Sequence, residues 1–203
     1  MATQTAGSTA LVTPIGYMSF PNLFTPKPRL NSQELAYSAT LIFDAAAQAS
    51  AEYAALKAAA FEACKAKFGS RMNDPSFVQR IKTPFNDAGV KSNLKGYEPG
   101  MTYINCWSKF PPGVVGPQRQ PMLEADVYAG QMARFSVQPY AYDQLGNVGV
   151  SFGLSNVQIA KVNMPRFDNR RSAEDTFGEL PVEDGQAIQA RQGQNAPTKE
   201  NPF

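Results

Sequence analysis

Histidine is absent from this sequence of 203 residues, and cysteine occurs only twice, at Cys64 and Cys106. The missing imidazole excludes Ser-His-Asp and Cys-His nucleophile systems and every histidine-ligated metal site. The two cysteines form no CxxC pair, which excludes a thiolate zinc site and argues against a disulfide scaffold. We therefore expect two reduced, buried thiols, no bound metal and no cofactor.

Long apolar runs are also missing, since no stretch approaches the roughly 18 residues that a membrane span requires. Residues 1–14 show no basic region followed by an apolar core, which argues against a secretion signal. Hydrophobic residues make up 43% of the chain and charged residues 18%, a globular composition. These features predict a soluble cytoplasmic protein that does not enter a membrane.

Enzyme signatures are missing as well. There is no GxxxxGK[ST] phosphate-binding loop, and Gly146, Gly149 and Gly153 lie in a hairpin pattern instead of a strand-to-helix turn. Glu124 and Asp126 could share one strand face, but a metal-dependent nuclease needs more converging acids. A solvated loop is the better interpretation of this pair, and we predict that the protein is not an enzyme.

The net charge of +2 is the sum of two opposed parts. Residues 1–171 carry 17 basic and 11 acidic side chains, a net charge of +6, whereas residues 172–203 carry a net charge of −4. A basic body with an acidic tail indicates a polyanionic partner.

One long helix is predicted among several short strands. Leu35–Phe43 alternates as a strand does, and the period becomes helical over Ala45–Phe68, with Asp44 as N-cap and Gly69 as the stop. The apolar stripe of this helix should pack against a sheet. Its members are Tyr53, Leu56, Ala60, Cys64 and Phe68.

The rest of the chain reads mainly as β-structure up to about residue 165. Two prolines in Thr25–Arg29 predict an extended connector that carries two positive charges. Gln144–Asn147 has the composition of a hairpin loop. Further strands are predicted at Phe77–Lys82, Met101–Phe110, Gln131–Tyr142 and Val148–Val162. Short strands with one helix favour a small closed or nearly closed barrel. Large apolar residues thin out over 166–203, which predicts a flexible, disordered acidic tail that ends at Phe203.

The strand at Met101–Phe110 carries the most informative pattern. One of its faces presents Tyr103, Asn105, Trp107 and Lys109. Two aromatic rings with a lysine are typical of a platform on which unpaired bases stack while the cation meets phosphate. The same rings could instead pack under the helix, and the strand alone leaves both interpretations open.

Basic and aromatic residues recur near the ends of the neighbouring predicted strands. Arg134, Tyr140 and Tyr142 belong to one strand, and Arg80 and Lys82 belong to an earlier one. Each basic residue taken singly could be an ordinary solvated surface charge. Their clustering with aromatic residues favours a nucleic-acid site.

Five segments together resemble the single-stranded DNA-binding proteins of tailed phages, a group with the OB fold. They are Ser19–Lys27, Tyr103–Ser108, Val127–Gly130, Pro139–Asp143 and Gly149–Val157. The resemblance implies an OB-type barrel that binds single-stranded DNA (ssDNA) without catalysis. It also implies a tail that contacts replication partners and competes with DNA for the cleft. This tail is less densely acidic than the family's best-studied ones, and the helix comes earlier than in a standard OB barrel, where it lies between the third and fourth strands.

The sequence therefore predicts an elaborated five-stranded OB-like barrel over residues 1–165 and a flexible tail over residues 166–203. Its function would be to coat ssDNA, with little sequence preference, during phage replication and recombination in the infected host cell. Tail residue Phe203 would bind a replication or recombination protein. A phage structural or assembly protein and an RNA-binding barrel of the cold-shock type are the alternatives. The predicted stacking residues are Tyr103, Trp107, Tyr140 and Tyr142, and the predicted phosphate contacts are Arg80, Lys82, Lys109 and Arg134.

Overall fold

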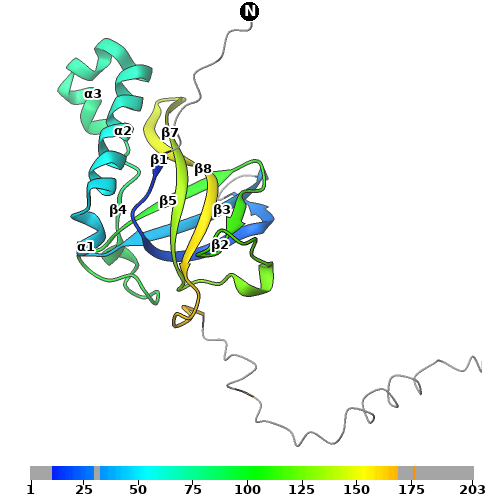
Figure 1. Cartoon of the computed structure of the whole chain (residues 1–203). Coiled ribbons are helices and arrows are strands. Elements are labelled where there is room, and N and C mark those ends of the chain that lie inside the picture. The colour runs from blue at the N-terminus through cyan, green and yellow to red at the C-terminus, as the bar shows by residue number, and fades with distance from the viewer. Residues whose placement is uncertain (1–10, 30–32, 169–175, 177–203) are drawn as a thin grey trace, which may run out of the picture. The chain divides into compact units, whose positions relative to one another are not determined.

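A computed structural model describes residues 11–29, 33–168 and 176 of the chain (Figure 1). Five long strands dominate the fold, and three strands of two or three residues extend the sheet. The long strands are β2 (Gly16–Pro28), β3 (Leu35–Phe43), β5 (Thr102–Ser108), β7 (Met132–Gln144) and β8 (Asn147–Lys161). The short strands are β1 (Leu11–Val12), β4 (Asn86–Asp87) and β6 (Gly113–Val115). The prediction of a mainly β protein with one long helix is confirmed.

The five long strands pair around a closed ring in the order β7, β2, β3, β5, β8 and back to β7. Neighbours in this ring are antiparallel except for β5 and β8, which run parallel. Such a five-stranded ring is the framework of the OB fold. The ring strands β2, β3, β5, β7 and β8 are thus the first to fifth strands of the barrel in chain order.

Inward-facing side chains of all five ring strands fill the barrel, because alternate residues of a strand point to opposite faces. Within β5, for example, Ile104 and Cys106 are almost completely buried, whereas the intervening Asn105 is exposed. Fully buried side chains of the ring include Met18, Leu23, Leu41, Phe43, Ile104, Phe135, Phe152 and Ile159. The predicted burial of both thiols is confirmed, since Cys64 also lies in the core.

Helix α2 (Ala51–Phe68) follows β3 and lies along one side of the barrel (Figure 1). All five residues of its predicted stripe are buried, and Tyr53 packs edge-on against Phe43 with ring centroids 5.2 Å apart. The helix therefore lies between the second and third strands of the barrel, earlier than in a standard OB barrel. No helix in the described ranges is long and apolar enough to cross a membrane.

The predicted helix over 45–68 is divided into α1 (Ala45–Gln48) and α2. Asp44 caps α1, as expected, and its carboxylate accepts a hydrogen bond from the backbone nitrogen of Ala47. Ser50 then caps α2 by accepting from the backbone nitrogen of Tyr53, so a second N-cap starts a new helix. Gly69 ends α2 with a positive φ of 52°, which confirms the predicted stop.

The predicted strand at Phe77–Lys82 is wrong, because most of this segment belongs to helix α3 (Pro75–Arg80). Asp74 caps that helix through the backbone nitrogen of Ser76, and Pro75 occupies the first turn, where its missing N–H costs nothing. Phe77 is buried against Phe68, with ring centroids 5.1 Å apart. A capping signal thus outweighed a short apolar pattern. Short 3₁₀ turns complete the fold at η1 (Gly69–Asn73), η2 (Ala88–Lys91) and η3 (Glu124–Asp126).

The predicted connector at Thr25–Arg29 is mostly strand. β2 continues through both prolines to Pro28, where Lys27 and Pro28 pair with Ala36 and Leu35 of β3. Irregular register earlier in this pairing lets the strand accept residues that lack an N–H donor. Arg29 is consequently held at the end of a strand and not in a free loop.

The β7–β8 hairpin matches its prediction. Gln144 pairs with Asn147, which leaves Leu145 and Gly146 as a two-residue turn. Both turn residues have positive φ, 50° and 82°, the backbone conformation that tight hairpins favour. The hairpin projects the ends of β7 and β8 beyond the barrel wall (Figure 1).

Residues after β8 run back across one end of the barrel. The backbone nitrogen of Phe167 donates to the carbonyl of Ala129 at 2.9 Å, and the Arg166 guanidinium lies 4.3 Å from the ring centroid of Tyr128. The tail was predicted to start at residue 166, and its first residues therefore contact the barrel. The rest of the predicted tail, Phe203 included, lies outside the described residues apart from Thr176.

Candidate nucleic-acid interface

A polar groove of about 650 Å³ crosses the outer face of β5. One wall comes from Arg29 and Glu34, which flank the connection between β2 and β3, and another comes from the β7–β8 hairpin. Three aromatic and three basic residues line the groove. They are Trp107, Tyr140 and Tyr142, and Arg29, Lys67 and Lys109.

The aromatic part of the groove is built around Trp107. The alternation of β5 buries Cys106 and turns Trp107 outward, where the indole remains half-buried. Tyr140 of β7 meets the indole edge-on, with ring centroids 6.0 Å apart and planes at 85°. The guanidinium of Arg29 lies over the indole, 3.8 Å from its centroid. Burial raises the pKa of Tyr140 above its ordinary value, which is itself well above physiological pH, so the phenol is neutral there.

Two of the three groove cations share one carboxylate. Oε1 of Glu34 lies 2.6 Å from Nζ of Lys109, and Oε2 lies 3.3 Å from Nη1 of Arg29. The hydrogen bond and charge of Lys109 lower the pKa of Glu34, with a smaller contribution from Arg29. All three side chains are more than a third exposed, so the cluster is open to solvent and to a ligand.

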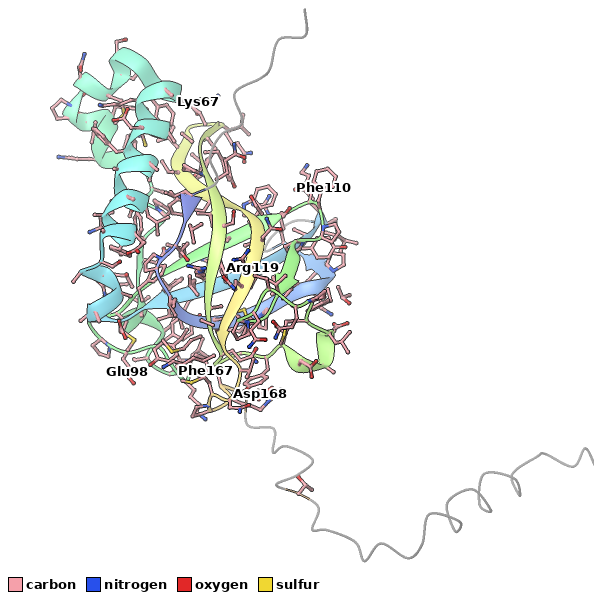
Figure 2. The ribbon with its side chains drawn as sticks, in the orientation of Figure 1. Lys67, Glu98, Phe110, Arg119, Phe167 and Asp168 are labelled. Atoms are coloured by element: carbon pink, nitrogen blue, oxygen red, sulfur yellow. The ribbon has the colours of Figure 1, made fainter. Side chains whose placement is uncertain are left out.

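Polar groups extend the groove on either side of this cluster. Thr40 donates from Oγ1 to Oδ1 of Asn105 at 2.8 Å, which leaves the amide group of Asn105 able to donate to a ligand. Lys67 reaches the groove from the last turn of α2 (Figure 2). The carboxylate of Asp143 pairs with Arg71 at 2.9 Å, which offsets its negative charge.

The structure brings four of the eight sequence-predicted residues into this groove. They are Trp107, Lys109, Tyr140 and Tyr142. Sequence reasoning missed Arg29 and Lys67 as site residues. The charge of Arg29 was visible next to the prolines, but nothing in the sequence marks Lys67, which looks like any outward-facing lysine of a helix.

Tyr103 does not line the groove, because it is only 6% exposed. It belongs to a small second core, where its ring packs edge-on against Tyr97 with centroids 5.5 Å apart. Strand β4 pairs with this end of β5, Asn86 opposite Tyr103, whereas Trp107 lies near the opposite end of the strand. Tyr103 is therefore a packing residue, but it packs in this second core and not under helix α2, as the alternative interpretation had it.

Arg80 and Lys82 lie beside the hairpin and outside the lining of the groove. Arg80 donates from Nη2 to the carbonyl of Gly146 at 3.4 Å. The backbone of Lys82 pairs with that of Val148 and Val150 in β8, and its side chain is exposed. Both cations therefore lie next to the aromatic groove without forming it.

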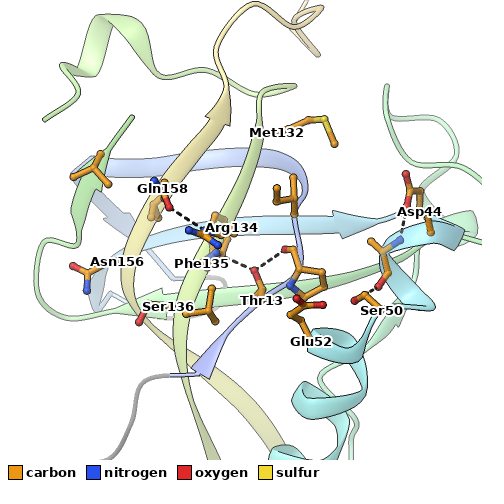
Figure 3. Close-up of a pocket in the computed structure, with 17 residues that line it drawn as sticks. Thr13, Asp44, Ser50, Glu52, Met132, Arg134, Phe135, Ser136, Asn156 and Gln158 are labelled. Atoms are coloured by element: carbon orange, nitrogen blue, oxygen red, sulfur yellow. Dashed lines mark hydrogen bonds between the residues drawn. The ribbon is translucent and has the colours of Figure 1, made fainter. Parts of the chain in front are cut away.

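Arg134 lies in a different groove of about 730 Å³, between β1, β7, β8 and the start of the helical segment (Figure 3). Its Nε donates to Oε1 of Gln158 at 2.9 Å. Asp44 and Glu52 also line this groove, and their charges would repel a phosphate chain. The larger groove is therefore the poorer candidate for a nucleic-acid site.

Comparisons with known proteins identify the fold and the family of this chain. A family model described as the ssDNA-binding protein of Enterobacter phage Enc34 matches residues 9–187. A solved structure of the single-stranded DNA-binding protein from bacteriophage Enc34 in complex with ssDNA superposes with a TM-score of 0.63 at 18% identity, covering 77% of this chain and 88% of that chain. Another structure of that phage protein gives a TM-score of 0.61 at 17% identity, covering 82% of this chain and 89% of that one. No curated protein sequence matched significantly.

The two structural matches show a shared fold, and the family model spans most of the chain, the whole barrel included. The resemblance predicted from the sequence is thereby confirmed. The chain belongs to the family of the Enterobacter phage Enc34 ssDNA-binding protein.

Proposed function

We propose that this protein binds single-stranded DNA, without catalysis, in the groove over β5. One observation carries the proposal: the groove lies where OB folds bind oligonucleotides, and it is lined by half-buried aromatic side chains and exposed basic side chains. OB folds use the face of their second and third strands, together with the loops between strands 1 and 2 and between strands 4 and 5. In this barrel those parts are β3 and β5, the β2–β3 connection and the β7–β8 hairpin.

The residues of the groove divide into two roles. Trp107, Tyr140 and Tyr142 supply rings on which successive bases stack, a contact that every base can make. Arg29, Lys67 and Lys109 supply positive charge to the phosphates between those bases. Recognition by ring faces and charge has little dependence on base identity, so sequence preference should be slight.

The wider biological role follows from the family. The name of the family and the ssDNA complex of the Enc34 protein support a role in coating and protecting ssDNA during phage replication or recombination. Such a protein would act in the cytoplasm of the infected host cell. Binding of a replication or recombination protein by the acidic tail and Phe203 stays a prediction.

A titration with labelled oligo-dT tests the proposal and separates it from the alternatives. We expect binding at low salt that weakens as salt rises, with a slope of about −2 for three phosphate contacts at ~0.7 each. RNA of equal sequence should bind no more tightly than DNA. Tighter binding to RNA would favour a cold-shock-type function. Failure to bind any oligonucleotide, with a large assembly on size exclusion, would favour a structural role.

A further inference from the structure

The groove proposed to bind ssDNA already contains an anion of the protein itself, the carboxylate of Glu34. Its two oxygens hold two of the three groove cations, Lys109 at 2.6 Å and Arg29 at 3.3 Å. A carboxylate and a phosphate are recognised by the same charge-assisted hydrogen bonds. Glu34 therefore occupies the position that a DNA phosphate would take between these two cations.

The same cluster also covers the principal stacking surface. Glu34 holds Arg29, and the guanidinium of Arg29 lies over the Trp107 indole at 3.8 Å from its centroid. A base that stacks on this face of the indole must displace the guanidinium. Without DNA, both the phosphate position and one ring face are filled by side chains of the protein.

We infer that Glu34 is an internal competitor for the phosphate backbone, and that it sets the affinity and the salt dependence of the groove. The inference rests on the proposed function of that groove. On binding, a phosphate replaces Glu34 between Lys109 and Arg29, and Arg29 moves off the indole with that phosphate. Exposed ion pairs such as these contribute little to stability, so the exchange is reversible at small cost.

Glu34 also limits how tightly the protein holds DNA, because its charge stays near the bound phosphate after the exchange. The groove cations Arg29, Lys67 and Lys109 attract DNA, and one carboxylate offsets part of that attraction. The resulting moderate affinity lets bound DNA dissociate, which suits a protein that must release the strand.

The substitution Glu34→Gln tests the inference, since it removes the charge and keeps the size of the side chain. A unit charge about 4 Å from another in water corresponds to about a fivefold change in affinity. We therefore expect E34Q to bind oligo-dT about fivefold more tightly than wild type at low salt. The gain should shrink as salt rises, because screening weakens the removed repulsion.

Glu98→Gln is the matched control, because Glu98 is exposed and does not line the groove. In Figure 2 it lies far from the groove residue Lys67 and from Phe110, which follows the groove residue Lys109 in the chain. It should leave the affinity unchanged, and equal melting temperatures for the three proteins would show that each is folded. Wild-type binding with E34Q unchanged or weaker would overturn the inference alone. Failure of the wild type to bind oligo-dT at low salt would overturn both the inference and the proposed function.

Discussion

The substitution Trp107→Ala removes the ring at the centre of the proposed groove. A base stacked on an aromatic side chain contributes about 1–3 kcal/mol. The indole also interacts with Arg29, whose guanidinium lies 3.8 Å from its centroid, and an exposed contact of this kind contributes about 0.5–1 kcal/mol. With the middle of each range, a base that takes the place of Arg29 gains the difference, about 1.25 kcal/mol. At 1.36 kcal/mol per tenfold change, W107A should raise the Kd for oligo-dT about eightfold.

Fluorescence anisotropy of labelled oligo-dT at fixed salt measures this change. Trp107→Phe keeps a ring at the site and should retain most of the affinity. Phe61→Ala is the control, because Phe61 is an aromatic side chain 52% exposed on α2, outside the groove. It should bind as wild type does. A folded W107A protein with unchanged Kd would refute the claim that bases stack on this indole.

Three further predictions concern charge, core packing and thiol chemistry. Lys67→Gln should weaken binding and reduce the salt slope by ~0.7, whereas Arg134→Gln, in the other groove, should change neither in the same titration. Phe135→Ala empties a fully buried position and should lower the free energy of unfolding by about 3–5 kcal/mol, as measured by urea denaturation. Burial raises the pKa of Cys64 and of Cys106, so both thiols should resist a thiol reagent at pH 8 in the native protein and react after unfolding. Rapid labelling of the native protein would contradict their burial.

Local periodicity in the sequence predicted most of the secondary structure. The alternation of β3 and the stripe from Tyr53 to Phe68 are properties of one segment each, and the structure matches both. The predictions failed where a second local signal, or pairing with another strand, outweighed the first signal. Apolar residues around Phe77 suggested a strand, but the Asp74 cap and Pro75 favoured a helix. The prolines of β2 suggested a connector, but pairing with β3 holds them in a strand.

The proposed binding groove could be predicted only in part, because it joins residues that the fold brings together from distant parts of the chain. Trp107, Lys109, Tyr140 and Tyr142 were identified from residue type and strand position, and all four line it. Alternation alone could not separate Tyr103 from Trp107, since both point to the same side of β5. What separates them is that β4 and Tyr97 pack over the end of β5 that holds Tyr103, and not over the end that holds Trp107.

Charge partners were beyond the reach of sequence reasoning for the same reason. Glu34 gives no signal as a groove residue, and its role appears only when Lys109 and Arg29 are seen at its two oxygens. The groove that contains Arg134 gives the opposite case, in which a residue that looks suitable in the sequence lies in unsuitable surroundings. Arg134 has the right chemistry in the sequence, but Asp44 and Glu52 lie around the same space.

The emission of Trp107 offers the most direct test of the binding site, because it is the only tryptophan in the chain. Unlabelled oligo-dT should change this emission in a saturable manner, with the same Kd that anisotropy gives for labelled oligo-dT. The change should reverse on addition of salt. Emission that stays constant while anisotropy shows DNA bound would place the DNA elsewhere on the protein and contradict the account.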